Sequence, residues 1–582
     1  MSSYSDIGNN NFYEMINNKF GKFKISKKKK TFEQICFPNK FELQVQQKFL
    51  AEFINPKTPY KSILIFHKIG AGKTCTAVSI AEKWKKERKI IVTVPASLIG
   101  NFKHELRSEC AGTNYLTNKE RELLLELHPS SDEYKEIIKK SNERIDKYYD
   151  IYSYNKFIEN AKLGKLKLKN ALLIIDEIQN MVSETGTYYD VLYKLIHEAP
   201  NDLRIIIMSA TPMFDKPVEI ALTMNLLRIP VEFPIGKEFE KMFISSKFNK
   251  QSKKFTYKAK NLDIFKERIR GYVSYYAGAP LIAFPEALIK YVKCEMSEFQ
   301  YRSYLTVLKK EEDKNKKFVK MKKYRAFKNG EILELPSNFF IGARIISNIA
   351  FPNKNIGIKG FESLKGKILE LENVQDYSIK FFKIINKISK SSGKIFIYSS
   401  FKSYGGIYSF VKILEGNGYK NYTNFGEGKK RFAIISGDQT KEEKENIKNI
   451  FNQKENINGH KLKIIYGSVS TREGYSFYSV QQVHILEPYW NLMRMKQIIG
   501  RAVRYCSHKD LPEEKRLVKV YIYVATHPDE EETVDQYIVK LAIQKAKIVN
   551  QFETALKEVA IDCELFKEGN SQADSEAVKC DT

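Results

Sequence analysis

A lysine and a threonine in the stretch HKIGAGKT are the first candidates for a catalytic or binding role. Gly70 and Gly72 allow the main-chain N–H groups around Ala71 to turn towards a phosphate at the start of a helix. Lys73 is then placed to reach the β- and γ-phosphates of ATP, and the Thr74 hydroxyl to bind Mg²⁺. The stretch therefore predicts a phosphate-binding loop with magnesium beside it.

One position of this loop departs from the usual pattern, because His67 stands where a first glycine is expected. Loose matches to the rest of the pattern arise by chance, and an ordinary strand–helix turn is the alternative. The flanking sequence favours the loop, since the apolar run SILIFH precedes it and a helix is expected over Thr74–Lys86.

Two carboxylates end a second apolar run, ALLIIDEIQ. Asp176 is suited to hold the water shell of Mg²⁺, and Glu177 to polarise the water that attacks the γ-phosphate. Adjacent carboxylates after a strand can also form a plain solvated loop. Their place downstream of Lys73 favours a shared site.

A pair of arginines lies far along the chain in QIIGRAVRYCSH. We expect Arg501 and Arg504 to share one helix face, with Gln497 one turn earlier. A guanidinium binds phosphate oxygens in pairs and keeps its proton, so these arginines could stabilise charge at the γ-phosphate from a second lobe. A surface helix with salt-bridged arginines is the alternative.

Short apolar runs separated by helical patterns lie around these residues. They predict parallel strands covered on both faces by helices. The alternation occurs twice, so we predict an α/β fold with two tandem RecA-like P-loop lobes. A Lys- and aromatic-rich segment links the lobes, and a helical tail follows them. The expected ranges are a loosely attached basic arm (1–35), lobe 1 (36–232), the linking region (233–370), lobe 2 (371–530) and a tail with a disordered end (531–582).

Composition narrows the class of protein further. The formal charge of +28 is compatible with a polyanion partner, although a lysine-rich chain from an A+T-biased genome would carry a similar charge. Seven scattered cysteines without a CxxC pair argue for free thiols and against a zinc site. We see neither a membrane-spanning run nor a secretory signal.

With these motifs in order, the chain resembles the superfamily 2 helicase-like ATPases of nucleocytoplasmic large DNA viruses, which include the poxvirus early transcription factor small subunit and the nucleoside triphosphate phosphohydrolase I group. The stretches that carry the resemblance include VPASLIGNFKHEL, YDIYSYNKF, DEIQN, SATPMFDKPVEI, STREGYSF, HILEPYWN and the closing VAIDC. The resemblance covers about residues 40–563.

The resemblance implies further site residues. Ser209 and Thr211 would relay the nucleotide state to the nucleic-acid groove, and Glu473 and Gly474 would meet the ribose and the lobe interface. Gln47 would lie near the adenine, with Gln46 an equal choice. Gln179 stands where many relatives carry histidine, and it could still hydrogen-bond to Ser209 or Thr211. The residues implied to line the groove are Pro95, Ser97, Ser153, Tyr154, Ser399 and Phe401.

Some of these groove residues have structural alternatives. Ser97 could cap a helix, and Tyr154 could belong to the core. Trp490 is expected to be a packing anchor rather than a platform for a base.

The leading function is an ATP-driven nucleic-acid translocase in viral transcription, with DNA favoured over RNA. A viral RNA polymerase or a second transcription-factor subunit would be its partner, and the virion and host cytoplasm its location. The alternatives are a processive unwinding helicase in replication, a transcription scaffold with a vestigial motor and, remotely, a P-loop kinase.

Overall fold

The computed structural model describes residues 4–27, 30–129, 131–183, 186–249, 254–311, 339–471, 475–573 and 578–581. The chain forms two compact units. Unit 1 consists of Met1–Ser245, Tyr257–Leu281 and Ile548–Thr582, and unit 2 of Ser246–Thr256 and Ile282–Lys547. Unit 1 is therefore assembled from three separate stretches of the sequence.

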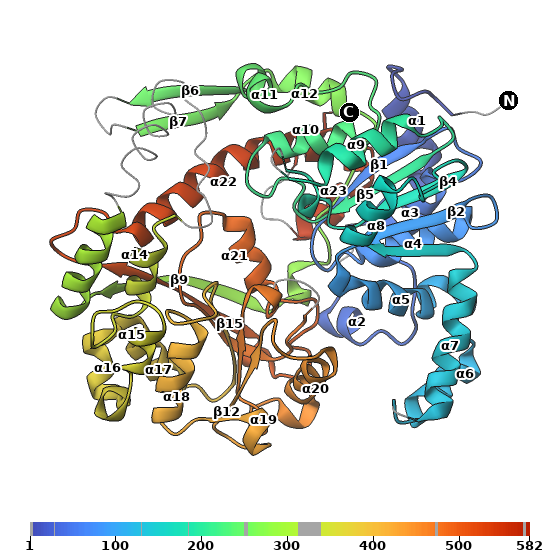
Figure 1. Ribbon diagram of the computed structural model, residues 1–582. Coiled ribbons are helices and arrows are strands. Elements are labelled where there is room, and N and C mark those ends of the chain that lie inside the picture. Colours follow the sequence, from blue (N-terminus) through green and yellow to red (C-terminus); the bar gives the residue numbers. More distant parts are fainter. Residues whose placement is uncertain are drawn as a thin grey trace. The chain divides into compact units, whose positions relative to one another are not determined.

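Unit 1 is built on a six-stranded parallel sheet with the order β3-β2-β4-β5-β1-β8. Its strands are β1 (Ser62–His67), β2 (Lys89–Val94), β3 (Tyr149–Ser153), β4 (Ala171–Ile175), β5 (Arg204–Ser209) and β8 (Val273–Tyr276). Every residue of β1 and β4 is buried, as expected for parallel strands covered on both faces (Figure 1). The strands predicted at the apolar runs SILIFH and ALLIID are confirmed.

The helices of unit 1 surround this sheet. They are α1 (Phe12–Lys19), α2 (Phe32–Cys36), α3 (Val45–Phe53), α4 (Lys73–Trp84), α5 (Ile99–Arg107), α6 (Asn118–Glu126), α7 (Asp132–Asp146), α8 (Tyr154–Lys162), α9 (Tyr189–Glu198), α10 (Val218–Asn225), α11 (Gly236–Phe243), α12 (Leu262–Ile269) and α23 (Cys563–Ala573). Helix α23, red in Figure 1, lies among the blue and teal elements of this unit although it is nearly last in sequence.

The N-terminal residues are part of the core and not a loosely attached arm, which corrects that expectation. Phe12 and Ile16 of α1 are fully buried, and the Tyr13 hydroxyl donates to the Val559 carbonyl oxygen at 2.7 Å. The ring of Phe20 packs edge-on against Phe49 of α3 at 5.3 Å. Aromatic side chains spaced for burial outweigh the polar average of this segment, since each buried ring contributes about 1.5–3 kcal/mol.

Unit 2 contains a seven-stranded parallel sheet with the order β11-β12-β13-β10-β14-β15-β9. The strands are β9 (Glu286–Glu295), β10 (Lys394–Tyr398), β11 (Lys420–Asn421), β12 (Arg431–Ile435), β13 (Ile464–Gly467), β14 (Val480–Ile485) and β15 (Leu517–Thr526). The helices are α14 (Ile341–Asn348), α15 (Ile358–Glu362), α16 (Leu371–Tyr377), α17 (Ile379–Ser389), α18 (Ile407–Gly416), α19 (Tyr422–Phe425), α20 (Lys441–Asn452) and α21 (Leu492–Ile499). The expected second alternation of strands and helices is present, and the two-lobed α/β fold is confirmed.

The segment expected to link the lobes contributes to both sheets. Strand β8 forms one edge of the unit 1 sheet, and β9 forms one edge of the unit 2 sheet. Between α11 and α12 lies a hairpin of β6 (Ile244–Asn249) and β7 (Lys254–Ala259). The segment is thus structural as well as connecting.

The tail is more ordered than expected. Helix α22 (Val534–Glu558) crosses the boundary between the units at Lys547 and Ile548. The helix α23 then occupies part of the range for which we expected disorder. Among the helices of the described residues, none combines the length and the apolar character needed to cross a membrane.

The cysteines also differ from the expectation of free thiols. Cys75 is bonded to Cys110, and Cys563 to Cys580. The Cα atoms lie 5.6 and 5.8 Å apart, within the usual range for a disulfide. Cys294 is a buried free thiol. Sequence separations of 35 and 17 residues carry no sign of such pairing, which depends on the fold.

Candidate nucleotide and nucleic-acid site

The phosphate loop follows the carboxyl end of β1. Gly70 and Gly72 have positive φ angles of 85° and 68°, the left-handed conformation that favours glycine. Gly72 caps α4, so Lys73 and Thr74 form the first helical turn, and both side chains are partly exposed. The main chain has the form that phosphate binding requires, while the ligand contacts of Ala71, Lys73 and Thr74 stay predictions.

Both candidate glutamines of α3 hold this loop. The Gln46 amide donates to the Ala71 carbonyl oxygen at 3.0 Å, and the Gln47 amide donates to that of Gly72 at 3.3 Å. The φ of 68° at Gly72 disfavours any other residue, and a Cβ atom there would lie 2.6 Å from the Gln47 amide nitrogen, so the Gln47 side chain would have to shift. The two glutamines therefore share the task of positioning the loop, and the contact of Gln47 with adenine stays a prediction.

The carboxylates and the SAT motif form one hydrogen-bonded chain at the carboxyl edge of the sheet. The Gln179 amide donates to the Glu177 carboxylate at 2.6 Å, and its carbonyl oxygen accepts from the Ser209 hydroxyl at 2.6 Å. That hydroxyl oxygen accepts from the Thr211 N–H at 2.9 Å. The predicted hydrogen bond between Gln179 and Ser209 is thus present. It links Glu177 on β4's end to the end of β5.

This chain is under local conformational constraint. Glu177 has a positive φ of 51°, which is uncommon for a residue with a Cβ. Its main-chain N–H donates to the Asp176 carboxylate at 2.9 Å, and the Asp176 side chain is almost fully buried. The Tyr154 hydroxyl donates to the main-chain carbonyl oxygens of both residues, at 3.0 Å for Glu177. Strain held by several contacts is typical of functional sites.

The groove residues of this unit have different positions. Ser97 is exposed after the carboxyl end of β2, and its hydroxyl caps no helix. Pro95, which precedes it, is buried. Ser153 caps α8 through the Lys156 N–H. Tyr154 is buried beneath the carboxylates, so its core alternative is right and it supports them instead of lining an open groove.

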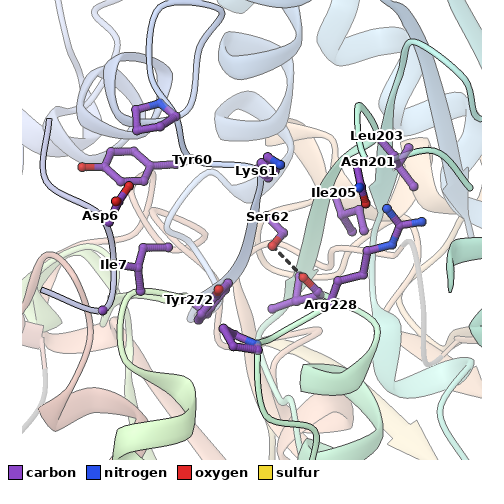
Figure 2. A pocket seen from close by; sticks show the side chains of 14 residues that line it. Asp6, Ile7, Tyr60, Lys61, Ser62, Asn201, Leu203, Ile205, Arg228 and Tyr272 are labelled. Atoms are coloured by element: carbon purple, nitrogen blue, oxygen red, sulfur yellow. Dashed lines mark hydrogen bonds between the residues drawn. The ribbon is translucent and has the colours of Figure 1, made fainter. Parts of the chain in front are cut away.

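A cavity of about 380 Å³ lies at the opposite end of the strands (Figure 2). Ser62, the first residue of β1, lines it and donates to the Leu227 carbonyl oxygen at 2.7 Å. The Arg228 guanidinium, also in its wall, donates to the Pro200 carbonyl oxygen at 3.0 Å. Since the phosphate loop follows the other end of β1, this cavity is separate from the nucleotide site.

The arginines of unit 2 lie beyond a helix and not on one, which corrects the expected helix face. Helix α21 ends at Ile499, so Gln497 is helical while Arg501 and Arg504 follow in a turn. The Arg501 guanidinium donates to the Gln497 and Tyr475 carbonyl oxygens at 3.2 and 3.1 Å, and that of Arg504 donates to Tyr475 at 3.4 Å. Both are therefore fixed to Tyr475, within the STREGYSF motif.

Two of the residues predicted to hold Mg²⁺ have side chains that suit this ion. A buried carboxylate at Asp176 and a hydroxyl at Thr74 are oxygen donors of the kind that Mg²⁺ uses together with water. When bound, Mg²⁺ would neutralise charge on the phosphates. Glu473 and Gly474 lie outside the described residues, so their contact with the ribose and the lobe interface stays a prediction.

Ser399 does not line a groove. It is fully buried, and its hydroxyl donates to the Glu487 carboxylate at 3.1 Å. The Asn348 amide donates to the same carboxylate at 3.2 Å, and burial raises the pKa of Glu487. Phe401 is partly exposed, with the Arg344 guanidinium 4.9 Å from its ring centre. The acidic residue of HILEP, missed as a site residue, thus organises the loop that Ser399 begins.

Trp490 packs as expected. Its ring stacks on Tyr489 at 4.0 Å, and the Arg344 guanidinium lies 5.1 Å from its centre. With 6% of its surface exposed, it anchors the core of unit 2 and offers no platform for a base.

Comparison with known families accounts for most of the chain. The SNF2-related domain family matches residues 45–339, the helicase conserved C-terminal domain matches residues 379–506, and the nucleoside triphosphatase I C-terminal domain matches residues 508–576. The last match contains all of α22 and all of α23. The nucleotide loop, the carboxylates and the arginines all lie inside the first two.

Viral proteins are similar over the same length. A protein of Acanthamoeba polyphaga mimivirus, provisionally named an ATP-dependent RNA helicase, is 53% identical over all of this chain and 99% of its own length. A second mimivirus protein with the same kind of name is 28% identical over 92% of this chain and 75% of its own length. A termination factor NPH-I homolog of African swine fever virus is 26% identical over 86% of this chain and 76% of its own length. The chain therefore belongs to the superfamily 2 helicase-like ATPases of large DNA viruses, with the C-terminal domain of nucleoside triphosphatase I.

Proposed function

We propose that this ATPase uses Mg²⁺-bound ATP to translocate along DNA during viral transcription, in contact with the viral RNA polymerase or a second transcription-factor subunit. Its site of action would be the virion and the cytoplasmic viral factory. The proposal goes beyond ATP hydrolysis and nucleic-acid binding, which are properties of the family.

One observation carries the motor part of the proposal. The hydrogen bonds from Glu177 through Gln179 to Ser209 join the residue predicted to polarise the attacking water to the SAT motif. A continuous polar connection of this kind lets the nucleotide state change the geometry of a neighbouring segment. The transcription role is supported by the nucleoside triphosphatase I domain at residues 508–576 and by the name of the swine fever virus relative, a termination factor homolog.

The decisive experiment measures the ATPase rate of the purified chain without nucleic acid and with single-stranded DNA, duplex DNA or RNA. We expect DNA to stimulate the rate and RNA to have a much smaller effect. A strand-displacement assay on a long duplex should give little product, while displacement of a bound roadblock protein should require ATP. Equal rates in all four reactions would refute translocation.

A second candidate is ATP-driven unwinding of RNA. The names of the two mimivirus relatives favour it. Stimulation by RNA above that by DNA, together with separation of an RNA duplex, would establish this function instead. The same two assays therefore decide between the candidates.

A further inference from the structure

Three buried polar side chains connect the base of the phosphate loop to the C-terminal segment of unit 1. His67 ends β1, Ser274 lies in β8, and Asp562 immediately precedes α23; all three are fully buried. The His67 Nε2 atom lies 2.9 Å from the Ser274 hydroxyl oxygen, and that hydroxyl donates to the Asp562 carboxylate. None of them belongs to the set that binds ATP or magnesium in the family motifs.

When Asp562 is ionised, above its pKa of about 7, the hydrogen bonds fix the direction of this chain. The Asp562 carboxylate also accepts from the Tyr275 N–H at 2.9 Å, so Asp562 serves as the acceptor at the end. A hydroxyl has one proton, and Ser274 uses it on Asp562, so Ser274 accepts the proton on His67 Nε2. His67 is then a neutral imidazole with an unprotonated Nδ1. Within the described part of the chain, this buried Nδ1 has no hydrogen-bond partner.

His67 interacts electrostatically with Lys73 of the phosphate loop. Burial and the positive charge of Lys73 together lower the pKa of His67 to about 3, which keeps the imidazole neutral. A neutral ring with a free acceptor faces no repulsion from the lysine ammonium, whereas a protonated ring would. His67, which stands where the usual pattern has glycine, is therefore an integral part of the structure around the loop.

The C-terminal segment also holds the strand on which the loop rests. The Ile561 N–H donates to the Val273 carbonyl oxygen at 2.8 Å, and the Asn570 side chain accepts from the Ala277 N–H at 2.8 Å. Together with Asp562 they satisfy the polar groups along the free edge of β8.

Strand β8 in turn lies against the loop. The Lys68 N–H donates to the Tyr276 carbonyl oxygen at 3.0 Å. At Gly278, a Cβ atom would come within 3.2 Å of the Ile69 carbonyl oxygen. The contacts therefore run without interruption from the C-terminal segment through β8 to the main chain of the loop.

We infer that the C-terminal segment sets the ATP affinity of unit 1 through Asp562, Ser274 and His67, with His67 as a positioning residue for the phosphate loop. Loosening of this segment, for example by a protein that binds it, would lower ATP affinity. The inference depends on the ATPase activity and not on the proposed role in transcription.

The test measures binding of ADP and of a non-hydrolysable ATP analogue to the full chain by calorimetry, without nucleic acid, alongside ATPase kinetics. Ser274→Ala removes the central hydroxyl. We expect KM for ATP and both dissociation constants to rise about five- to tenfold, the effect of one lost hydrogen bond, with kcat within about twofold. The double variant Ser274→Ala/Asp562→Asn should be no weaker than Ser274→Ala, because the three residues act as one unit.

The matched control is Tyr13→Phe, which removes a hydrogen bond to the C-terminal segment at Val559 and the acceptor of the Gly271 N–H, and leaves the side chains from His67 to Asp562 in place. It should bind ATP as the wild type does. If Ser274→Ala does not fold, judged by its thermal unfolding, Asp562→Asn alone gives the same comparison. Unchanged affinity in a folded variant, or an equal loss in Tyr13→Phe, overturns the inference, and either result leaves the test of DNA translocation unaffected.

Discussion

Substitution of Gln179 is the most direct test of how ATP hydrolysis is coupled to the rest of unit 1. It makes two hydrogen bonds of 2.6 Å, one to the Glu177 carboxylate and one from the Ser209 hydroxyl. Gln179→Ala removes both without changing the main chain of the phosphate loop. Glu177 would then lose the donor that fixes the direction of its carboxylate, so the attacking water would be poorly oriented.

The size of the effect follows from the charge on Glu177. A hydrogen bond to a charged group contributes about 1.5–3 kcal/mol. Loss of that amount from the transition state lowers kcat by roughly 10- to 150-fold. The dissociation constant for ADP should not change, because Gln46 and Gln47 still hold the loop.

The assay is the steady-state release of phosphate at saturating ATP, with and without nucleic acid. Gln179→His is the matched control, since a neutral imidazole offers one donor and one acceptor and should keep most of the activity. Ser209→Ala should lower the nucleic-acid stimulation and show a coupling energy of about 1 kcal/mol with Gln179→Ala in a double-mutant cycle. A kcat for Gln179→Ala within about twofold of wild type would refute the reasoning.

Three other variants test separate features. Lys73→Ala should lower kcat about 10²- to 10³-fold by removing positive charge at the phosphates, with an unchanged melting temperature in calorimetry as the check that it folds. The Lys380 ammonium lies 2.7 Å from the Asp535 carboxylate, and both are buried. Lys380→Met leaves that carboxylate without its ionic partner, so the free energy of unfolding in urea should fall by about 3–5 kcal/mol. A fall below about 1 kcal/mol would contradict this. Burial raises the pKa of Asp562 to about 7, above its value near 3.9 in the unfolded chain. Between these two pH values the folded state binds one more proton than the unfolded state. The free energy of unfolding therefore falls as the pH rises through that window. Urea unfolding at about pH 5 and about pH 8 should show this fall in wild type and a smaller one in Asp562→Asn, and equal falls would show that Asp562 does not titrate there.

The sequence predicted the parts of the fold that leave a local pattern. Strands such as β1 and β4 are continuous apolar runs because parallel strands are covered on both faces, and the phosphate loop shows its glycines directly. Strands β8 and β9 were missed for a physical reason. Residues Val273–Tyr276 are only four long, and most residues of Glu286–Glu295 are exposed, so neither resembles a buried strand.

The candidate site was predictable where one residue type defines the chemistry, and less so where tertiary contacts decide. Arg501 and Arg504 have helical spacing, yet the helix ends at Ile499 and carbonyl oxygens of the following turn hold the guanidinium groups. Ser399 occupies the expected motif position, but a distant carboxylate at Glu487 draws its hydroxyl into the core. No periodicity in a single sequence reports such a partner.

The three-part composition of unit 1 has a consequence for the order of events during synthesis on the ribosome. The residues of unit 2 between Ile282 and Lys547 leave the ribosome as one stretch, and their sheet can form as soon as they emerge. The edge of β8 remains uncovered until Ile561 and Asn570 have been made. Unit 1, which contains the phosphate loop, is therefore the first unit to be translated and the last to be completed. A truncated product would carry the loop of Lys73 without the segment that completes its sheet.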